Sequence, residues 1–192
     1  MKFTKISESA FKELQLNAGI ILDSFNPTSG DVELSSILGA TSGGVNFTAT
    51  PVFSDFGEDV DNCPINTKEM KQLDSMEVRM SGTFVSVNAA SVKRMIGAAD
   101  VNGNKITPRH NLKAEDFTDL WWVGDYSDKN GESAGGFIAV HMMNTLSTGG
   151  IAIQSGKSEK GQFSFEFTAH YSMNAPDQVP FEVYVKAGAE EA

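Results

Sequence analysis

Two segments in the first half of the chain alternate between apolar and polar residues. In the first, residues 45–53 (VNFTATPVF), every second residue on one side is apolar: Val45, Phe47 and Ala49. In the second, residues 75–87 (SMEVRMSGTFVSV), the apolar positions are Met76, Val78 and Met80. A period of two predicts β-strands with one buried face. At Gly82 the alternation loses its phase, which predicts a bulge or bend in the second strand.

Apolar runs bounded by turn residues predict the remaining strands. The first is the segment 18–25 (AGIILDSF), and two more lie within 116–146, joined by a tight turn at Asn130-Gly131. The others are expected at 150–154, 161–172 and 179–187. The sequence therefore predicts seven or eight strands.

One segment has helical periodicity. In NAASVKRMIGAA, Asn88 or Ser91 can cap a helix at about 89–98, and Val92, Met95 and Ile96 then form one apolar stripe. A short helix with a single apolar stripe is expected to pack against the face of a sheet. The pattern as a whole predicts a mainly β fold, a β-sandwich or barrel of two packed antiparallel sheets with one flanking α-helix.

The length of 192 residues fits one domain. We expect an N-terminal arm or short helix over 1–18, the β-domain over 19–186 and a frayed tail over 187–192. The formal charge is −10, which disfavours binding to free nucleic acid or to an anionic membrane. No apolar run reaches the roughly 20 residues that a membrane-spanning helix needs, and the start of the chain does not resemble a signal peptide. With Cys63 as its one cysteine, the chain is expected to fold in a reducing cytoplasm.

The sequence offers little catalytic chemistry. His110, His141 and His170 do not lie at metal-ligand spacings from one another or from Cys63. Neither a phosphate-binding glycine loop nor a Gly-x-Ser-x-Gly nucleophile motif is present. We therefore expect no cofactor, no metal and no enzymatic activity.

Two features could mark a binding surface. Trp121 and Trp122 are adjacent in a predicted strand, so their rings point to opposite sides, one into the core and the other to an exposed or interface face. The second feature is a polar excursion over about 54–75, between the two alternating strands. Its run DFGEDVD is acidic, and insertions of this length in compact domains are usually functional or disordered.

The segments GEDVDNCPINTKEMKQLDSMEVRMSGTFVSV and KGQFSFEFTAHYSMNAPDQVPFEVYV, with a short helix after the first, carry a resemblance. In this order they are similar to the major tail tube proteins of long-tailed bacteriophages with non-contractile tails. The resemblance covers most of Val45 to Lys186. The region before Val45 matches no part of that family's pattern.

The resemblance implies a structural virion protein, made in the bacterial host cytoplasm, that assembles as stacked hexameric rings into a tail tube for DNA ejection. Its expected partners are further copies of itself, the tape measure protein, and the tail terminator and distal tail proteins. DNA would pass through the lumen without specific binding, because carboxylates repel phosphates.

The resemblance also implies roles for particular residues. The long loop would contact an adjacent ring or subunit, becoming ordered on assembly, with the candidates Asp55, Glu58, Asp59, Asp61, Asn62, Pro64, Lys68 and Lys71. Candidate acidic residues facing the lumen are Glu77, Glu166 and Glu182. Trp121 and Trp122 are the candidate interface aromatics.

Two alternatives remain open from the sequence. The chain could be a monomeric ligand- or carbohydrate-binding β-sandwich that uses Trp121 and Trp122 as a stacking platform. It could also be a hydrolase that uses paired carboxylates such as Glu77 and Glu166, provided that these lie roughly 5–10 Å apart in a cleft.

Overall fold

The computed structural model describes residues 10–126 and 135–188, and within them the chain forms eleven strands, one α-helix and four short 3-10 helices. The strands are β1 (Gln15–Leu22), β2 (Ile37–Gly39), β3 (Thr41–Asp55), β4 (Lys71–Phe84), β5 (Ala99–Asn102), β6 (Lys105–Pro108), β7 (Thr118–Tyr126), β8 (Gly136–Ser147), β9 (Ala152–Gln154), β10 (Gln162–Thr168) and β11 (Phe181–Lys186). The helix is α1 (Ala89–Ile96), and the 3-10 helices are η1 (Ala10–Glu13), η2 (Leu34–Ser36), η3 (Lys68–Met70) and η4 (Ala114–Asp116).

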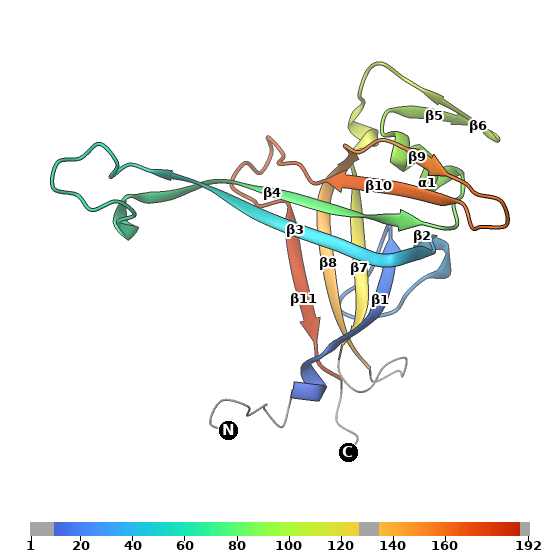
Figure 1. The fold of residues 1–192 in the computed structure, drawn as a ribbon, viewed down its shortest axis with the longest axis horizontal. Coiled ribbons are helices and arrows are strands. Elements are labelled where there is room, and N and C mark those ends of the chain that lie inside the picture. Colours follow the sequence, from blue (N-terminus) through green and yellow to red (C-terminus); the bar gives the residue numbers. More distant parts are fainter. Residues whose placement is uncertain (1–9, 127–134, 189–192) are drawn as a thin grey trace.

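The strands form a β-sandwich, which confirms the predicted fold class. The hydrogen-bonded order is β2-β1-β7-β8-β10-β4-β3, with β11 paired to β8, β9 paired to β10, and all pairings antiparallel. The link between β8 and β10 is short, through Phe167 opposite Ser147 and Thr168 opposite Leu146. Figure 1 shows β3, β4 and β10 crossing over the layer of β1, β7, β8 and β11. β5 and β6 form a separate small hairpin.

The main core lies between the two layers. Val78 and Met80 of β4 are fully buried there, while Asn46, Thr48 and Thr50 of β3 are exposed, as the period-two pattern predicts. Burying one such side chain stabilises the fold by about 1.5–3 kcal/mol relative to leaving it in water. The other buried members of this core are Ile21, Leu38, Phe84, Met95, Leu120, Val140, Met142, Phe165, Phe167 and Ala169.

A second, smaller core lies on the other face of β1, β7 and β8. It contains Leu22, Trp121, Val123, Phe137 and Ala139. The segment between β1 and η2 covers it, because Phe25 contacts the ring of Trp121 edge-on at 5.6 Å and the ring of Phe137 at 5.2 Å. The central layer is therefore buried on both faces.

The bulge predicted at Gly82 is in the partner strand. β4 runs without interruption through Gly82, and the register shift is in β3 between Thr41 and Val45, where Gly43 and Gly44 have φ of 81° and 82°. Gly82 has a different reason to be glycine: a Cβ there would lie 2.8 Å from Cζ of Phe165. Met80 and Phe84 are both fully buried, so the alternation keeps its phase through Gly82.

Helix α1 forms as predicted but ends at Ile96 rather than at 98. Asn88 and Ser91 cap it together: Oδ1 of Asn88 accepts from the Ser91 backbone N–H at 2.9 Å, and Oγ of Ser91 accepts from the Asn88 N–H at 2.8 Å. Gly97 ends the helix with φ of 83°. Met95 is fully buried, and Val92 packs against the main core.

The ends of the chain differ from the predicted bounds. β1 begins at Gln15 and ends at Leu22, so the segment 15–18 belongs to the sheet rather than to an arm, and residues 23–25 leave it. η1 precedes β1. The predicted turn at Asn130-Gly131 and most of the tail over 187–192 lie outside the described residues.

The predicted loop over 54–75 is wrong in its bounds. β3 and β4 continue to pair from Pro51 opposite Met76 out to Asp55 opposite Lys71. The excursion is therefore a β-hairpin whose connection spans only residues 56–70. The sequence did not predict these strand ends, because neither of their faces is buried and their residues therefore do not alternate between apolar and polar.

Candidate functional site: the projecting hairpin

The outer part of the β3–β4 hairpin extends well beyond the sandwich (Figure 1). We call residues 51–75 the hairpin arm. Its strands pair with each other, and no second layer of the described chain covers them. The register shifts between Val52 and Phe53, so that Asp74 is an extra residue on β4. Oγ of Ser54 donates a hydrogen bond to Oδ2 of Asp74 at 2.5 Å.

The hairpin arm exposes large apolar side chains. Seven of them are at least one-third exposed, among them Ile65 at 75% and Phe56 at 62%. The others are Val52, Phe53, Val60, Met70 and Leu73. Single exposed apolar residues are common on any surface, but a gathering of them on one projecting element is typical of an interaction site.

Asp55 organises the connection at the end of the arm. Its Oδ1 accepts a hydrogen bond from the Gly57 backbone N–H at 3.0 Å, and its Oδ2 accepts one from the Asn66 N–H at 3.0 Å. Nζ of Lys71 donates to Oδ1 of Asn66 at 2.7 Å. These bonds join the start, the end and the base of the connection, so Asp55 and Lys71 hold the arm together internally.

Further contacts fix the shape of the connection. Asn62 and Asn66 take the left-handed backbone conformation, with φ of 62° and 63°, which asparagine tolerates better than most residues. Oγ of Thr67 donates to the carbonyl oxygen of Pro64 at 2.7 Å, and the thiol of Cys63 lies 3.5 Å from the same hydroxyl. The connection therefore has its own hydrogen bonds within one chain, and the ordering of this segment by a partner stays a prediction.

The charged residues of the arm fall into two groups. Asp55 and Lys71 are bonded within the arm, and Lys68 forms an exposed ion pair with Glu69 at 3.3 Å. Within the described part of the chain, Glu58, Asp59 and Asp61 are exposed and make no ion pair or hydrogen bond through their carboxylates. These three remain available to a partner, as do the exposed Asn62 and Pro64.

The candidate lumen residues separate into two places. Glu77 of β4 and Glu166 of β10 meet at Arg79 on the outer face of the sandwich: Arg79 hydrogen-bonds Glu77, and its Nη1 lies 3.6 Å from Oε1 of Glu166. The pKa of Arg79 is raised by the hydrogen bond and charge of Glu77. A guanidinium that pairs with both carboxylates does not favour the division into acid and nucleophile that a hydrolase requires. Glu182 lies elsewhere, on β11.

The two tryptophans are placed on opposite faces, but neither forms an open platform. Trp121 is 8% exposed and stacks on the His141 ring at 4.0 Å with an interplanar angle of 6°. Trp122 is half-buried against the main core, and its Nε1 donates to the Ala18 carbonyl oxygen at 3.0 Å. The rings face opposite sides of the sheet, and that the second ring lies on an exposed or interface face stays a prediction. These contacts do not favour the ligand-binding alternative.

The most chemically suggestive cluster surrounds His141. Its Nε2 lies 3.0 Å from Oδ2 of Asp119, and its Nδ1 lies 3.7 Å from Oε2 of Glu182. The Tyr184 hydroxyl donates to Glu182 at 2.5 Å, and this bond raises the pKa of Tyr184. Asp119 also accepts from the Asn144 backbone N–H at 3.1 Å. These contacts tie β7, β8 and β11 together, which favours a structural role.

The other two histidines have surroundings that suggest no chemistry. His110 is exposed, and Nδ1 of His170 hydrogen-bonds the Asn144 carbonyl oxygen at 3.1 Å.

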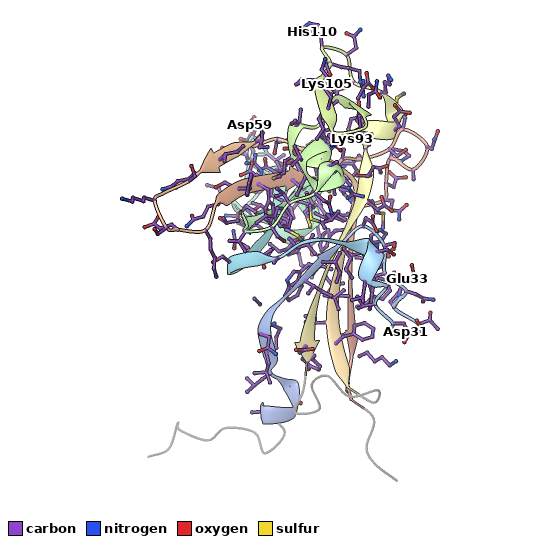
Figure 2. The ribbon with its side chains drawn as sticks, turned by 90° about the vertical axis from the view of Figure 1, so that its right-hand side faces the viewer. Asp31, Glu33, Asp59, Lys93, Lys105 and His110 are labelled. Atoms are coloured by element: carbon purple, nitrogen blue, oxygen red, sulfur yellow. The ribbon has the colours of Figure 1, made fainter. Side chains whose placement is uncertain are left out.

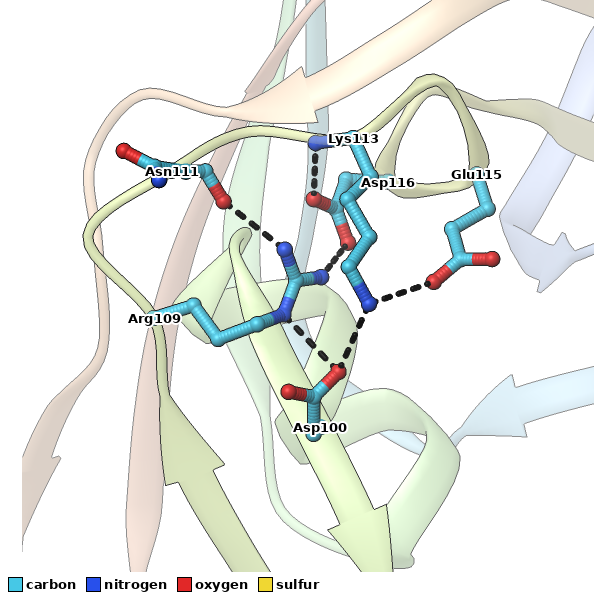
Figure 3. Close-up of polar contacts among 6 residues, drawn as sticks. All are labelled: Asp100, Arg109, Asn111, Lys113, Glu115 and Asp116. Carbon is cyan, nitrogen blue, oxygen red and sulfur yellow. Dashed lines mark hydrogen bonds and ion pairs between the residues drawn. The ribbon is translucent and has the colours of Figure 1, made fainter.

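A buried ion pair that the sequence did not predict joins the chain after β6 to η4 (Figure 3). Nη2 of Arg109 donates to Oδ1 of Asp116 at 2.6 Å, and Oδ2 of Asp116 accepts from the Lys113 backbone N–H at 2.8 Å. Burial would raise the pKa of Asp116, but the hydrogen bonds from Lys113 and Arg109 outweigh it and hold the pKa below its usual range. Asp100 adds a contact at 2.8 Å to Nε of Arg109. Arg109 and Asp116 are seven residues apart in an irregular segment, so no sequence periodicity indicated that they would meet.

A groove of about 650 Å³ lies beside β1, β7 and β8. Gly19, Gly30, Gly124, Gly135 and Gly136 form much of its wall, with Asp31, Asp125 and Lys186 at the polar side. None of the sequence-predicted site residues lines it. Three of these glycines are required by close packing, since a Cβ at Gly19, Gly124 or Gly136 would lie less than 3.0 Å from a neighbouring atom.

Neither searches for metal and membrane features nor comparisons with known proteins identify the function. Among the described residues no group of His, Cys, Asp and Glu side chains is arranged to hold a metal, and no helix is long and apolar enough to cross a membrane. The chain matches no protein-family model, and it matches no curated protein. The hairpin arm is therefore taken as the candidate functional site because it projects from the sandwich and exposes large apolar side chains.

Proposed function

We propose that the protein is a structural subunit that associates with further copies of itself through the hairpin arm. The observation that carries this proposal is the arm itself: an ordered projection with seven exposed large apolar residues and no covering layer from the residues that the structure describes. Burying such side chains in another copy would remove apolar surface from water, which drives most protein association.

The particular assembly that we propose is a stack of hexameric rings forming the tail tube of a long-tailed bacteriophage, through which DNA is ejected. Support comes from the resemblance of residues 45–186 to that family, from the mainly β fold and from the acidic composition. In a ring, symmetry repeats each carboxylate that faces the central hole. Even a few such residues per chain would therefore give a lumen that repels DNA. Glu77 and Glu166 remain candidates for such a surface, but the positive charge of Arg79, which pairs with both, would reduce their repulsion of DNA. Tape measure, terminator and distal tail proteins would be the other partners.

The first test removes the arm's connection. Residues 56–70 are replaced by Asn-Gly, a sequence that favours a tight turn between antiparallel strands. The purified proteins are then compared by negative-stain electron microscopy and by light scattering at rising concentration. We expect rings or tubes with a central hole from the wild type and monomers with an unchanged melting temperature from the variant.

A second variant keeps the arm and changes only its apolar surface, with Phe53→Ser, Phe56→Ser and Ile65→Ser. Its control carries Leu34→Ser and Met173→Ser, at residues that are 85% and 99% exposed outside the arm. Only the arm variant should lose assembly. Equal assembly by all variants, or a wild type that stays monomeric at every concentration, would contradict the proposal.

A further inference from the structure

The two ends of the long axis of the molecule carry net charges of opposite sign. The hairpin arm carries six acidic and two basic residues. The opposite end consists of α1, the β5–β6 hairpin, the following loop with η4, and the β9–β10 turn; we call these residues, 88–116 and 148–161, the basic end. The basic end carries seven basic and four acidic residues, in a chain whose net charge is −10.

Figure 1 shows the separation directly. The connection of the hairpin arm lies at the far left, while β5, β6, β9 and α1 lie at the right. In Figure 2, which faces the right-hand side of that view, Lys93 and Lys105 lie on the α1–β5–β6 part, away from Asp31 and Glu33. The molecule therefore has a long-axis charge asymmetry.

The unpaired charges follow the same division. Among the lysines whose side chains the structure describes, four form no ion pair, hydrogen bond or ring contact, and these four belong to the basic end: Lys93, Lys105, Lys157 and Lys160. The available carboxylates of the arm are those of Glu58, Asp59 and Asp61. Each end thus presents charged groups that form no ion pair within their own chain, although Lys93 also acts at longer range on the Asp116 carboxylate.

The basic end also exposes apolar side chains that could meet those of the arm. Ile153 is 64% exposed and Leu112 is 55% exposed, and Val101 and Ile151 are also exposed. The two ends therefore match in both respects, with apolar surface on each and opposite charge around it. Such a pattern is the usual basis of specificity in protein association.

We infer that the hairpin arm of one copy docks on the basic end of the next copy, so that the subunits associate head to tail. This inference rests on the proposed self-association and adds its acceptor surface and its polarity. A head-to-tail contact uses two different surfaces, so it closes a ring or continues as a chain. An arm-to-arm contact would instead bring the same carboxylates together, and like charges would oppose it.

The test reverses the charge of each end. The arm variant carries Glu58→Lys, Asp59→Lys and Asp61→Lys, and the end variant carries Lys93→Glu, Lys105→Glu, Lys157→Glu and Lys160→Glu. Each alone should associate at least about tenfold more weakly than the wild type in sedimentation at low salt, because several exposed charge pairs become repulsive. A control with Asp31→Lys and Glu33→Lys should associate as the wild type does.

Mixing gives the decisive result. In an equimolar mixture of the arm variant and the end variant, every contact between unlike copies again joins opposite charges, so association should return. The chain with both reversals should also associate alone. A circular dichroism spectrum and melting curve for each variant establish that it is folded.

Cross-linking separates failure of this inference from failure of the proposed function. Isotope-labelled and unlabelled wild-type copies are mixed and treated with a carbodiimide, which joins lysines to carboxylates in contact. Links between Glu58, Asp59 or Asp61 and lysines of the basic end in another copy are expected. Assembly with links elsewhere would overturn the head-to-tail contact alone, and absence of both assembly and links between copies would overturn self-association as well.

Discussion

Gly82 shows how a missing side chain places an aromatic cluster. The Phe165 ring occupies the space where a Cβ of Gly82 would lie, and Phe165 in turn contacts the Phe84 ring at 4.4 Å between centroids. Two strands, β4 and β10, approach through this arrangement. The glycine is thus part of the core even though it contributes no apolar surface of its own.

Gly82→Ala should therefore destabilise the fold by about 1–3 kcal/mol, because the rings must shift in a closely packed core. The measurement is the free energy of unfolding in urea. Gly161→Ala is the control, since a Cβ there would meet Phe163 only at 3.5 Å, an ordinary contact. Equal stability of Gly82→Ala and wild type would show that β10 can move away without loss.

The Arg109–Asp116 pair predicts a dependence of stability on pH. The pKa of Asp116 is held below its ordinary value of 3.8 in the folded protein. The stabilisation is therefore complete above that ordinary value and is lost as the pH falls through the lower, folded-state pKa. Urea unfolding at a series of pH values below about 4 should show this loss.

Asp116→Asn should remove part of that pH dependence and lower the free energy of unfolding at neutral pH by about 2–3 kcal/mol, because Arg109 then lacks its buried charged partner. Asp31→Asn, at an exposed residue, should leave both quantities unchanged. A pH profile of Asp116→Asn that follows the wild type would place the acid sensitivity in other carboxylates.

The hairpin arm is an element that orders itself at its far end through one carboxylate. Asp55→Ala removes the acceptor of two backbone N–H groups, those of Gly57 and Asn66. Hydrogen exchange measured by mass spectrometry should therefore become faster in peptides covering 56–70, with the core peptides unaffected. Asp59→Ala should exchange as the wild type does, since the Asp59 carboxylate bonds no group in the described chain.

The inner and outer parts of this hairpin also show what a sequence can predict. The strand that contains Val78 and Met80 could be predicted because one of its faces is buried and the other is exposed. The strand residues of the arm carried no such alternation, since apolar Phe53 and Leu73 lie opposite each other on a part of the sheet that nothing covers. The fold class and the helix followed from burial and capping, which are local patterns.

The candidate site followed only in part. The acidic run pointed to the segment that we propose as the site. The internal role of Asp55, however, depends on backbone groups at Gly57 and Asn66, and these approach Asp55 only in the folded turn. Likewise Glu182 and His141 meet because β11 adds to β8 at a distance in sequence that no pattern encodes. Contacts between distant segments could not be predicted from the sequence, and neither could the burial of Trp121 against His141.

The chain as a whole is dipolar along its long axis, and ionic strength should reveal whether this matters. Raising the salt from about 0.05 M to about 0.5 M shortens the range of electrostatic attraction and should weaken wild-type association. Association driven by the apolar side chains alone would be unchanged or stronger in salt. Analytical ultracentrifugation at fixed protein concentration distinguishes the two outcomes.

The attachment of the arm has a mechanical consequence. β3 pairs with β4, and β4 pairs with β10 through six consecutive residue pairs, from Phe163 opposite Phe84 to Thr168 opposite Arg79. A tensile force applied along the arm would run parallel to these strands and load the hydrogen bonds between β4 and β10 together, in shear. A sideways force would instead peel them apart one at a time. The arm is thus anchored to bear tension along its own length.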